Sequence, residues 1–153
     1  MQIAKFFDTE VTGVCSTSKV ETTHSIGADF VIDYTKEDFK KKGKQYALII
    51  DVVGNRSVSD YKRVLVPNGR CIIIGFTSMG RLLQHALFGV WASITGNKKV
   101  DLMGTAQMNR EDLIFVKELI EAGKVKPVID RRYSLSDVVK LLGILKKDTP
   151  GEK

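Results

Sequence analysis

The sequence predicts a doubly wound α/β domain with a mainly parallel sheet. Strand-like and helix-like patterns alternate through most of the 153 residues, which is typical of successive βαβ units. One of the strand patterns, Tyr46–Val53, is a continuous apolar run apart from Asp51, and Arg70–Gly75 is a second pattern expected to be a buried strand. Such runs are expected of strands in a parallel sheet, because helices cover both of its faces.

Apolar spacing and glycine stops define the elements of the first third of the chain. Gly27 marks the end of a helix, because glycine readily adopts the left-handed conformation found just after helix C-termini. The expected elements are a helix at Gln2–Phe7, a strand at Glu10–Cys15, a helix at Lys19–Ser25, a short strand at Phe30–Asp33 and a charged helix at Lys36–Lys42.

The rest of the chain continues the alternation with a looser middle. Pro67-Asn68-Gly69 ends one helix, and Asn109 is a good N-cap for a later helix that Gly123 ends. The expected elements are a strand at Tyr46–Val53, helix Ser57–Leu65, strand Arg70–Gly75, helix Met79–Ile94, strand Lys99–Gly104, the helix after Asn109, and a last helix at Val138–Leu145 opened by Ser136 and Asp137.

The predicted order begins one element late for a nucleotide-binding fold. In such folds a helix-to-strand step normally follows a first strand and a glycine-rich phosphate-binding turn. We therefore expect residues 1–153 to form a single, partial dinucleotide-binding (Rossmann-type) domain of a longer enzyme, lacking that strand and turn. Strands Glu10–Cys15 and Tyr46–Val53 must then pair directly, leave a gap, or borrow a strand from another chain.

Composition narrows the function classes. The chain is 43% hydrophobic and has no apolar run near the ~20 residues of a membrane span, and no signal-peptide pattern. Cys15 and Cys71 lie in apolar runs, which favours buried thiols in a reducing cytoplasm. The net charge is +6, but the basic run at Lys40–Lys44 has no interleaved aromatics. We expect a solvated loop there and no contact with nucleic acid or membrane.

The first candidate site follows the strand Glu10–Cys15. Dinucleotide folds that bind NAD place an acid here for the ribose hydroxyls, whereas small polar and basic residues make room for the 2′-phosphate of NADP. This chain has Ser16, Thr17, Ser18 and Lys19, with no acid before Glu21. A helix-capping box, closed by Glu21 and opened by Thr17 or Ser18, explains the same residues.

Two further candidates are glycines that follow apolar strands. Val53 and Gly54 end one strand, and Gly75 ends another before Phe76 and Thr77. Glycine at the carboxyl edge of a parallel sheet lets the backbone approach a ligand, although ordinary turns need it as well. Tyr34, just past another strand, can stack or hydrogen-bond in the same crevice or lie on a surface turn.

The sequence predicts neither a catalytic residue nor a metal site. No nucleophile has a neighbouring base. His24 is expected to be exposed, and His85, among leucines, to be a core or interface histidine. The two histidines and two cysteines lack metal-ligand spacing.

Several motifs together resemble the medium-chain dehydrogenase/reductase superfamily, in particular its zinc-independent NADPH:quinone oxidoreductase-like branch. The resemblance covers Gln2 to about Leu145. The motifs are Met1–Lys5, Ser25–Asp29, Val31–Tyr34, Asp51–Gly54, Pro67–Arg70, Leu119–Ile129 and Tyr133–Val138, of which Leu119–Ile129 is the most specific.

The resemblance implies an oxidoreductase that transfers hydride from NADPH to a quinone, enone or aldehyde. Lys19 and Tyr34 match positions that hold the 2′-phosphate, with Ser16 in the same turn. Val53-Gly54 and Gly75-Phe76-Thr77 match the walls around the adenosine and nicotinamide halves. The strand Val100–Gly104 matches an edge that pairs with a second subunit, so a homodimer is expected.

Departures from the family pattern limit these expectations. The glycine-rich turn and the GroES-like catalytic domain of the family are absent from this sequence. The chain alone is therefore expected to show no appreciable quinone or alcohol turnover, and NADPH is preferred over NADH wherever cofactor binding survives without the glycine-rich turn. A nucleotide-binding module for assembly, or another doubly wound enzyme such as a methyltransferase, are the alternatives, but a methyltransferase would want a glycine-rich loop and an acid after the second strand.

Overall fold

The computed structural model describes residues 1–39, 43–75, 80, 97–103, 109–129 and 132–137. Their elements alternate as the sequence predicts, and every strand pair is parallel. The elements are α1 (Gln2–Phe6), β1 (Thr12–Cys15), the 3₁₀ helix η1 (Thr17–Lys19), α2 (Val20–Ser25), β2 (Phe30–Asp33), β3 (Tyr46–Asp51), α3 (Val58–Val64), β4 (Leu65–Ile73), β5 (Lys99–Leu102), α5 (Arg110–Glu121) and η3 (Leu135–Asp137).

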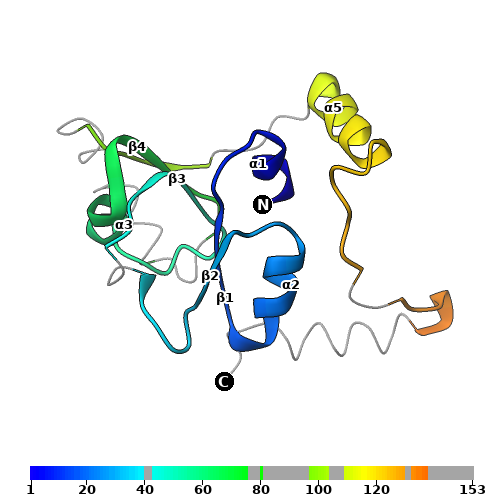
Figure 1. Cartoon of the computed structure of the whole chain (residues 1–153), viewed down its shortest axis with the longest axis horizontal. Helices are drawn as coiled ribbons and strands as arrows, with labels where there is room; N and C mark the ends of the chain where they lie inside the picture. Colours follow the sequence, from blue (N-terminus) through cyan, green and yellow to red (C-terminus); the bar gives the residue numbers. More distant parts are fainter. Residues whose placement is uncertain (40–42, 76–79, 81–96, 104–108, 130–131, 138–153) are drawn as a thin grey trace.

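Strands β1 and β2 form one parallel pair, covered by α2 (Figure 1). The register runs from Thr12 opposite Phe30 to Cys15 opposite Asp33. Gly13 lets α2 lie directly on β1, because a Cβ there would come within 2.4 Å of the Thr23 side chain. This unit is the first βαβ repeat that the sequence predicts.

Strands β3, β4 and β5 form a second sheet in that order, with α3 packed on it. Helix α3 begins at a capping box, in which the Ser57 side chain accepts from the Asp60 N–H and the Asp60 carboxylate accepts from the Ser57 N–H. The main hydrophobic cluster of the described residues lies between α3 and this sheet and consists of Val58, Tyr61, Leu65, Cys71, Ile73 and Val100.

Among the described residues the two sheets are not joined by strand pairing. Of the three expected outcomes for β1 and β3, direct pairing is therefore absent, and each strand keeps an open edge. The expectation that Tyr46–Val53 is covered on both faces is wrong: Leu48 and Ile50 are 54% and 60% exposed. Only the opposite face, through Ile49, packs against the core.

Helix α5 lies apart from the sheets and contacts α1 (Figure 1). The Phe115 ring lies 5.9 Å from that of Phe6, and Gln2 exchanges two hydrogen bonds with the Lys126 backbone. Asn109 caps the helix by accepting from the Glu111 N–H, as predicted. Gly123, with φ of 69°, follows its end.

Other expectations have mixed outcomes. Residues Lys36 to Asp38 form a turn and an irregular segment, so the helix predicted at Lys36–Lys42 is wrong over this part, and residues 40–42 lie outside the description. Strand β4 begins at Leu65, so Pro67–Gly69 lies within it as an irregularity in the pairing rather than before it. The helices expected at Met79–Ile94 and Val138–Leu145 also lie outside the described residues.

Candidate functional site

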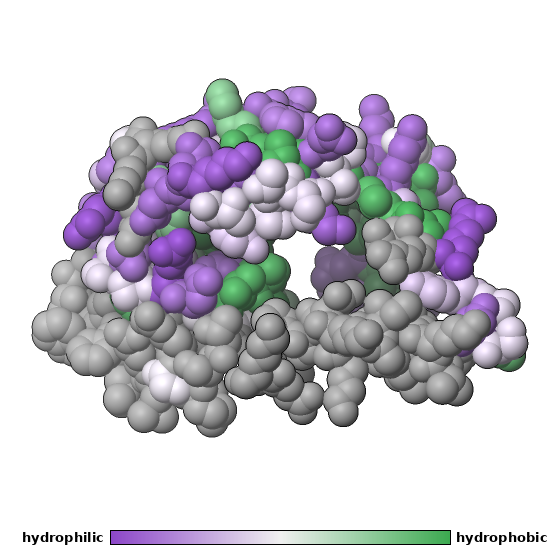
Figure 2. All heavy atoms as spheres, turned by 90° about the horizontal axis from the view of Figure 1, so that it is seen from below, coloured by the Kyte–Doolittle hydropathy of each residue, from purple (hydrophilic) through white to green (hydrophobic). Residues whose placement is uncertain are grey.

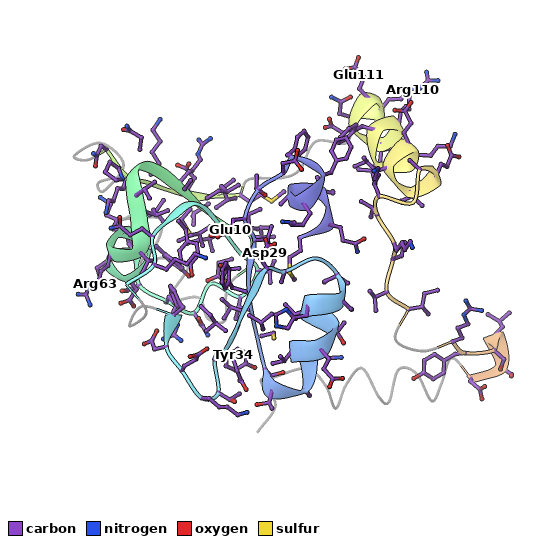
Figure 3. All side chains as sticks on the ribbon, viewed as in Figure 1. Glu10, Asp29, Tyr34, Arg63, Arg110 and Glu111 are labelled. Carbon is purple, nitrogen blue, oxygen red and sulfur yellow. The ribbon has the colours of Figure 1, made fainter. Side chains whose placement is uncertain are left out.

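The first group of predicted residues lies where β1 and β2 end. Cys15 and Asp33 are paired, and the Tyr34 N–H donates to the Cys15 carbonyl at 3.0 Å. The turn Ser16–Lys19 therefore lies beside Tyr34, as the resemblance implies. Figure 3 shows Tyr34 at the opposite end of these strands from Glu10 and Asp29. We call this region the β1–β2 corner.

Asp33 organises the β1–β2 corner. Its carboxylate accepts from the Thr17 hydroxyl at 2.5 Å, from the Thr35 hydroxyl at 2.7 Å and from the Thr35 N–H at 3.0 Å. These hydrogen bonds, that of Thr17 foremost, lower the pKa of the Asp33 carboxyl to about 2. Asp33 is only 8% exposed, so a buried, ionised carboxylate fixes both turns.

The expected capping box at Thr17 or Ser18 is wrong. Ser16 is the N-cap of η1, Lys19 is the N-cap of α2, and neither side chain caps its helix. The Thr17 hydroxyl is instead donated to Asp33, and the hydroxyls of Ser16 and Ser18 lie 3.2 Å apart. Thr17 has therefore used its only hydroxyl proton and cannot also donate it to a ligand.

Two ammonium groups belong to this corner. Lys19 is exposed and has no ion-pair partner within the described residues. Lys36 lies 3.5 Å from Asp33 and is 70% exposed at its side chain. Tyr34 is 56% exposed, so its ring is accessible from solvent. The corner thus presents two exposed cations, hydroxyls and one accessible aromatic ring.

The second group lies where β3 and β4 end, and its two glycine turns touch. Gly54 has φ of 61°, and a Cβ there would lie 2.0 Å from the Gly75 carbonyl oxygen. A Cβ on Gly75 would lie 2.3 Å from the Val52 carbonyl oxygen. Each glycine is therefore required by the neighbouring turn, which is the structural alternative that the sequence left open.

A buried tyrosine holds this second turn through Asp51. One Asp51 oxygen accepts from the N–H groups of Val53 (2.8 Å) and Gly54 (3.0 Å), and the other accepts from the Tyr61 hydroxyl. Tyr61 is 1% exposed. Burial, and then the Asp51 hydrogen bond and charge, raise the pKa of Tyr61 far above its usual value, so the hydroxyl stays a donor.

The predicted residues therefore form two groups rather than one demonstrated crevice. Ser16, Thr17, Lys19 and Tyr34 lie at the β1–β2 corner, and Val53, Gly54 and Gly75 at the end of β3 and β4. Phe76 and Thr77 lie outside the described residues. His24 is exposed, as expected. Both cysteines are free, Cys71 buried and Cys15 partly buried.

Sequence reasoning missed Asp33, Asp51 and Tyr61. A sequence signal existed for Asp33: it ends the strand after Glu10–Cys15, and parallel neighbours bring their carboxyl ends together. The sequence analysis looked for an acid only after the strand Glu10–Cys15. The Asp51–Tyr61 pair had no comparable signal, because ten residues and a turn separate the two side chains.

Two general findings apply to the described part of the chain. No group of three histidine, cysteine or acidic residues there is placed to hold a metal ion. No helix there is both long and apolar enough to cross a bilayer.

Comparison with known proteins places these features in a family. A family model described as zinc-binding dehydrogenase matches residues 26–145. The chain is 33% identical over 140 residues to the chloroplastic quinone-oxidoreductase QR1 of Triphysaria versicolor, covering 89% of this chain and 41% of that protein. It is also 33% identical over 127 residues to an NAD-dependent alcohol dehydrogenase of Sulfolobus acidocaldarius, covering 80% of this chain and 35% of that protein.

A solved structure, the quinone oxidoreductase from Coxiella burnetii, matches with a TM-score of 0.72 at 23% identity, covering 95% of this chain and 44% of that one. This similarity shows the α/β fold. The chain spans about two fifths of the length of these relatives. The chain therefore belongs to the zinc-binding dehydrogenase family, as a part similar to the quinone oxidoreductases of the medium-chain dehydrogenase/reductase superfamily.

Proposed function

We propose that this chain is the NADPH-binding part of an oxidoreductase that transfers hydride to a quinone, enone or aldehyde. The observation that supports the cofactor choice is the β1–β2 corner. It carries the exposed Lys19 and Lys36 and the hydroxyls of Ser16 and Ser18, which are groups of the kind that donate to the oxygens of a ribose 2′-phosphate. The relatives include an NAD-dependent enzyme and an NAD(P)H oxidoreductase, so their names do not distinguish NADPH from NADH. The preference for NADPH is part of this proposal.

The donor set at this corner fits a phosphate better than a ribose diol. A diol donates protons and needs a carboxylate acceptor, as NAD-binding folds provide. The carboxylate present, Asp33, is already bonded to Thr17 and Thr35. Lysine ammonium groups and serine hydroxyls donate to phosphate oxygens. Thr17 contributes by ordering the turn, and Tyr34 offers a ring or hydroxyl to the adenosine.

The second group supplies the walls of the proposed site. Val53, Gly54 and Gly75, with Phe76 and Thr77, would line the path from the adenosine to the nicotinamide. Val53 is 46% exposed and so presents apolar surface at the sheet edge. No residue of this chain is proposed to be catalytic, and the chain alone is proposed to bind cofactor without turnover. The proposed reaction needs no zinc ion. The cytoplasmic location stays a prediction.

Calorimetric titration of the chain with NADPH and NADH tests the proposal. We expect NADPH to bind at least tenfold more tightly. Lys19→Ala should remove a charge-assisted contact of about 1.5–3 kcal/mol and bring the two affinities together. Lys117→Ala is the matched control, because Lys117 is an exposed lysine on α5. Equal affinities for NADPH and NADH in the unmodified chain would reject the NADPH preference.

We also propose that the chain forms a homodimer through β5. This strand lies at one edge of its described sheet, and an open edge can pair with its copy. Met103 follows it and is 45% exposed, whereas Leu102 packs on the core and is a poor test position. Light scattering behind size exclusion should show a dimer that Met103→Lys dissociates and Leu113→Lys, on α5, does not. A monomer at micromolar concentration would contradict the proposal.

A further inference from the structure

One side chain holds the turn at Val53 and Gly54. An oxygen of the Asp51 carboxylate accepts from the N–H groups of both residues, at 2.8 Å and 3.0 Å. The Asp51 carbonyl accepts from the Ile74 N–H at 2.8 Å, directly before the second turn at Gly75. Asp51 is therefore bonded to both of the segments that we propose as walls of the cofactor site.

The second oxygen of the Asp51 carboxylate accepts from the Tyr61 hydroxyl. A carboxylate bonded at both oxygens is held in one orientation, whereas bonds at a single oxygen leave it able to tilt. Tyr61 is 1% exposed, so its hydroxyl donates from within the hydrophobic core, where an acceptor that loses its donor is costly to leave unpaired. The orientation of Asp51 therefore depends on Tyr61.

Helix α3 brings Tyr61 to this position. Its capping box fixes where the helix begins. Val58 and Tyr61 on the helix, and Leu65 directly after it, follow at helical spacing and are all buried in the cluster between α3 and the sheet. The apolar packing of the helix thus places a hydroxyl under a turn that lies ten residues away from Asp51 to Tyr61 along the chain.

The two turns cannot shift independently. Gly54 has φ of 61°, and a Cβ there would lie 2.0 Å from the Gly75 carbonyl oxygen, so the two backbones are in close contact. A movement of the Val53–Gly54 turn must therefore displace the Gly75 turn or open the contact between them. Loss of the Tyr61 donor would loosen Asp51 and, through it, both turns.

We propose that Tyr61 is a positioning residue of the cofactor site: through Asp51 it holds the Val53–Gly54 turn, and with it the Gly75 turn, in the form that binds cofactor. This inference rests on the proposed cofactor-binding function. Tyr61 is buried and acts without touching the cofactor. It sets the fraction of molecules whose turns are competent to bind, and the apparent affinity falls in proportion to that fraction.

This role predicts a loss of affinity that does not depend on the 2′-phosphate. The two turns would line parts of the cofactor that NADPH and NADH share, whereas the β1–β2 corner would meet the phosphate that only NADPH carries. Tyr61→Phe should therefore weaken both cofactors equally, by about tenfold, and leave the ratio of their affinities unchanged. Lys19→Ala should instead weaken NADPH alone.

Tyr46→Phe is the matched control on the same strand. Tyr46 begins β3, whereas Asp51 ends it, and the Tyr46 hydroxyl has no hydrogen-bond partner within the described part of the chain. Its side chain lines a cavity of about 420 Å³ with residues of β1, α2 and β2. In the space-filling view, hydrophobic surface borders a hollow near the middle of the molecule (Figure 2). Tyr46→Phe should leave both affinities unchanged.

Gly123→Ala is the control for a general loss of stability. It strains a residue with φ of 69° after the end of α5, where nothing lies within 4 Å of the new Cβ. It should therefore destabilise the chain at a distance from the proposed walls and leave both affinities unchanged. A loss of affinity in Tyr61→Phe but not in Gly123→Ala separates positioning of the site from stability alone.

Calorimetric titration of the full chain with NADPH and with NADH tests the proposal, at a temperature where circular dichroism shows every variant to be folded. We expect equal losses for the two cofactors in Tyr61→Phe and none in the two controls. Unchanged affinities in Tyr61→Phe, a loss for NADPH alone, or the same loss in Gly123→Ala would overturn the proposal. If the unmodified chain binds neither cofactor, the proposed function itself is rejected, and this inference with it.

A measurement on the unmodified chain decides the question if Tyr61→Phe does not fold. The NMR signal of the tyrosine Cζ atom, which carries the hydroxyl, reports on the hydrogen bond of that hydroxyl. Coupling between sites is reciprocal, so NADPH should shift the Tyr61 Cζ signal with the same midpoint as the Val53 and Gly54 amides. The Tyr46 Cζ signal should stay in place. A Tyr61 signal that does not move while the two amides shift would overturn the proposal.

Discussion

The two sheets differ in what holds them together. The β3–β4–β5 sheet has an apolar interior, with Leu65, Cys71 and Ile73 fully buried. The β1–β2 pair has few buried hydrophobic residues, Ala28 and Ile32, and depends on the polar Thr23 and Asp33 as well. The stabilisation from apolar burial does not depend on pH, whereas that from hydrogen bonds to an ionised carboxylate does. The two sheets should therefore respond differently to the same perturbation, such as a fall in pH.

The two halves of the proposed cofactor site lie in different sheets, and they too are held by different interactions. The β1–β2 corner is held by the Asp33 carboxylate, which accepts hydrogen bonds from hydroxyls of two neighbouring turns, and it presents the exposed Lys19 and Lys36. The turns at Gly54 and Gly75 are held by close packing between their backbones and by the buried Tyr61, which donates to Asp51. Hydrogen bonds to one carboxylate therefore hold the corner, whereas backbone packing and one buried hydrogen bond hold the Gly54 and Gly75 turns.

The two cysteines, one in each sheet, provide the largest expected contrast. Burial, and then the charges of Asp51 and Asp101, raise the pKa of Cys71 to about 12. A rise from the ordinary value of 9.0 leaves on the order of a thousandfold less thiolate at neutral pH. Alkylation followed by mass spectrometry should label Cys15, which is only partly buried, far faster than Cys71. Equal labelling would show that the β3–β4–β5 core opens as readily as β1–β2.

Gly54→Ala should disrupt the contact between the two wall turns. Its Cβ would meet the Gly75 carbonyl while φ stays positive, so we expect a loss of about 3 kcal/mol or more in unfolding free energy. Gly123→Ala is the matched control, because φ there is 69° but nothing lies within 4 Å of the new Cβ. It should cost about 1–2 kcal/mol. Equal losses in urea titrations would mean that the turns do not pack as described.

Tyr61→Phe should have an intermediate effect. It leaves one oxygen of the Asp51 carboxylate without its buried donor, at a cost of about 1–3 kcal/mol. Tyr34→Phe removes a hydroxyl from a side chain that is 56% exposed and should change stability by less than about 0.5 kcal/mol. If the two variants unfold at the same urea concentration, Tyr61 does not hold the Val53–Gly54 turn.

Asp33→Asn should reveal the pH sensitivity of the corner. The folded pKa of about 2 lies below the ordinary value of 3.8, so the stabilisation is present above about pH 4 and is lost as the pH falls toward 2. The stability difference between the unmodified chain and the variant should therefore shrink over that range. Glu118→Gln, on exposed α5, is the control. A difference that stays constant from pH 5 to pH 2 would contradict the role of Asp33.

Local patterns predicted the elements well where the signal was local. The strand Phe30–Asp33, the cap at Asn109 and the stop at Gly123 follow from spacing and capping chemistry. The helix predicted at Lys36–Lys42 is wrong over Lys36–Asp38, because charge spacing alone does not bury a face. The exposed face of β3 could not be foreseen from its apolar run, because exposure depends on what covers the strand.

The candidate site was predictable in its positions and less so in its contacts. Strand-end reasoning located Ser16–Lys19, Tyr34, Val53, Gly54 and Gly75. It could not show that Thr17 is bonded to Asp33, since that contact depends on the register of β1 with β2. Nor could it show that Gly54 and Gly75 need each other, because their contact is between backbones of two separate turns.

Chemical-shift mapping of the chain with 2′,5′-ADP and 5′-AMP tests the central claim most directly, because only the first carries the 2′-phosphate. We predict that 2′,5′-ADP shifts the amides of Ser16 to Lys19 and of Tyr34, and binds at least tenfold more tightly than 5′-AMP. NADPH should extend the shifts to Val53, Gly54 and Gly75. Equal binding of the two nucleotides, or shifts confined to residues outside the β1–β2 corner, would contradict the account.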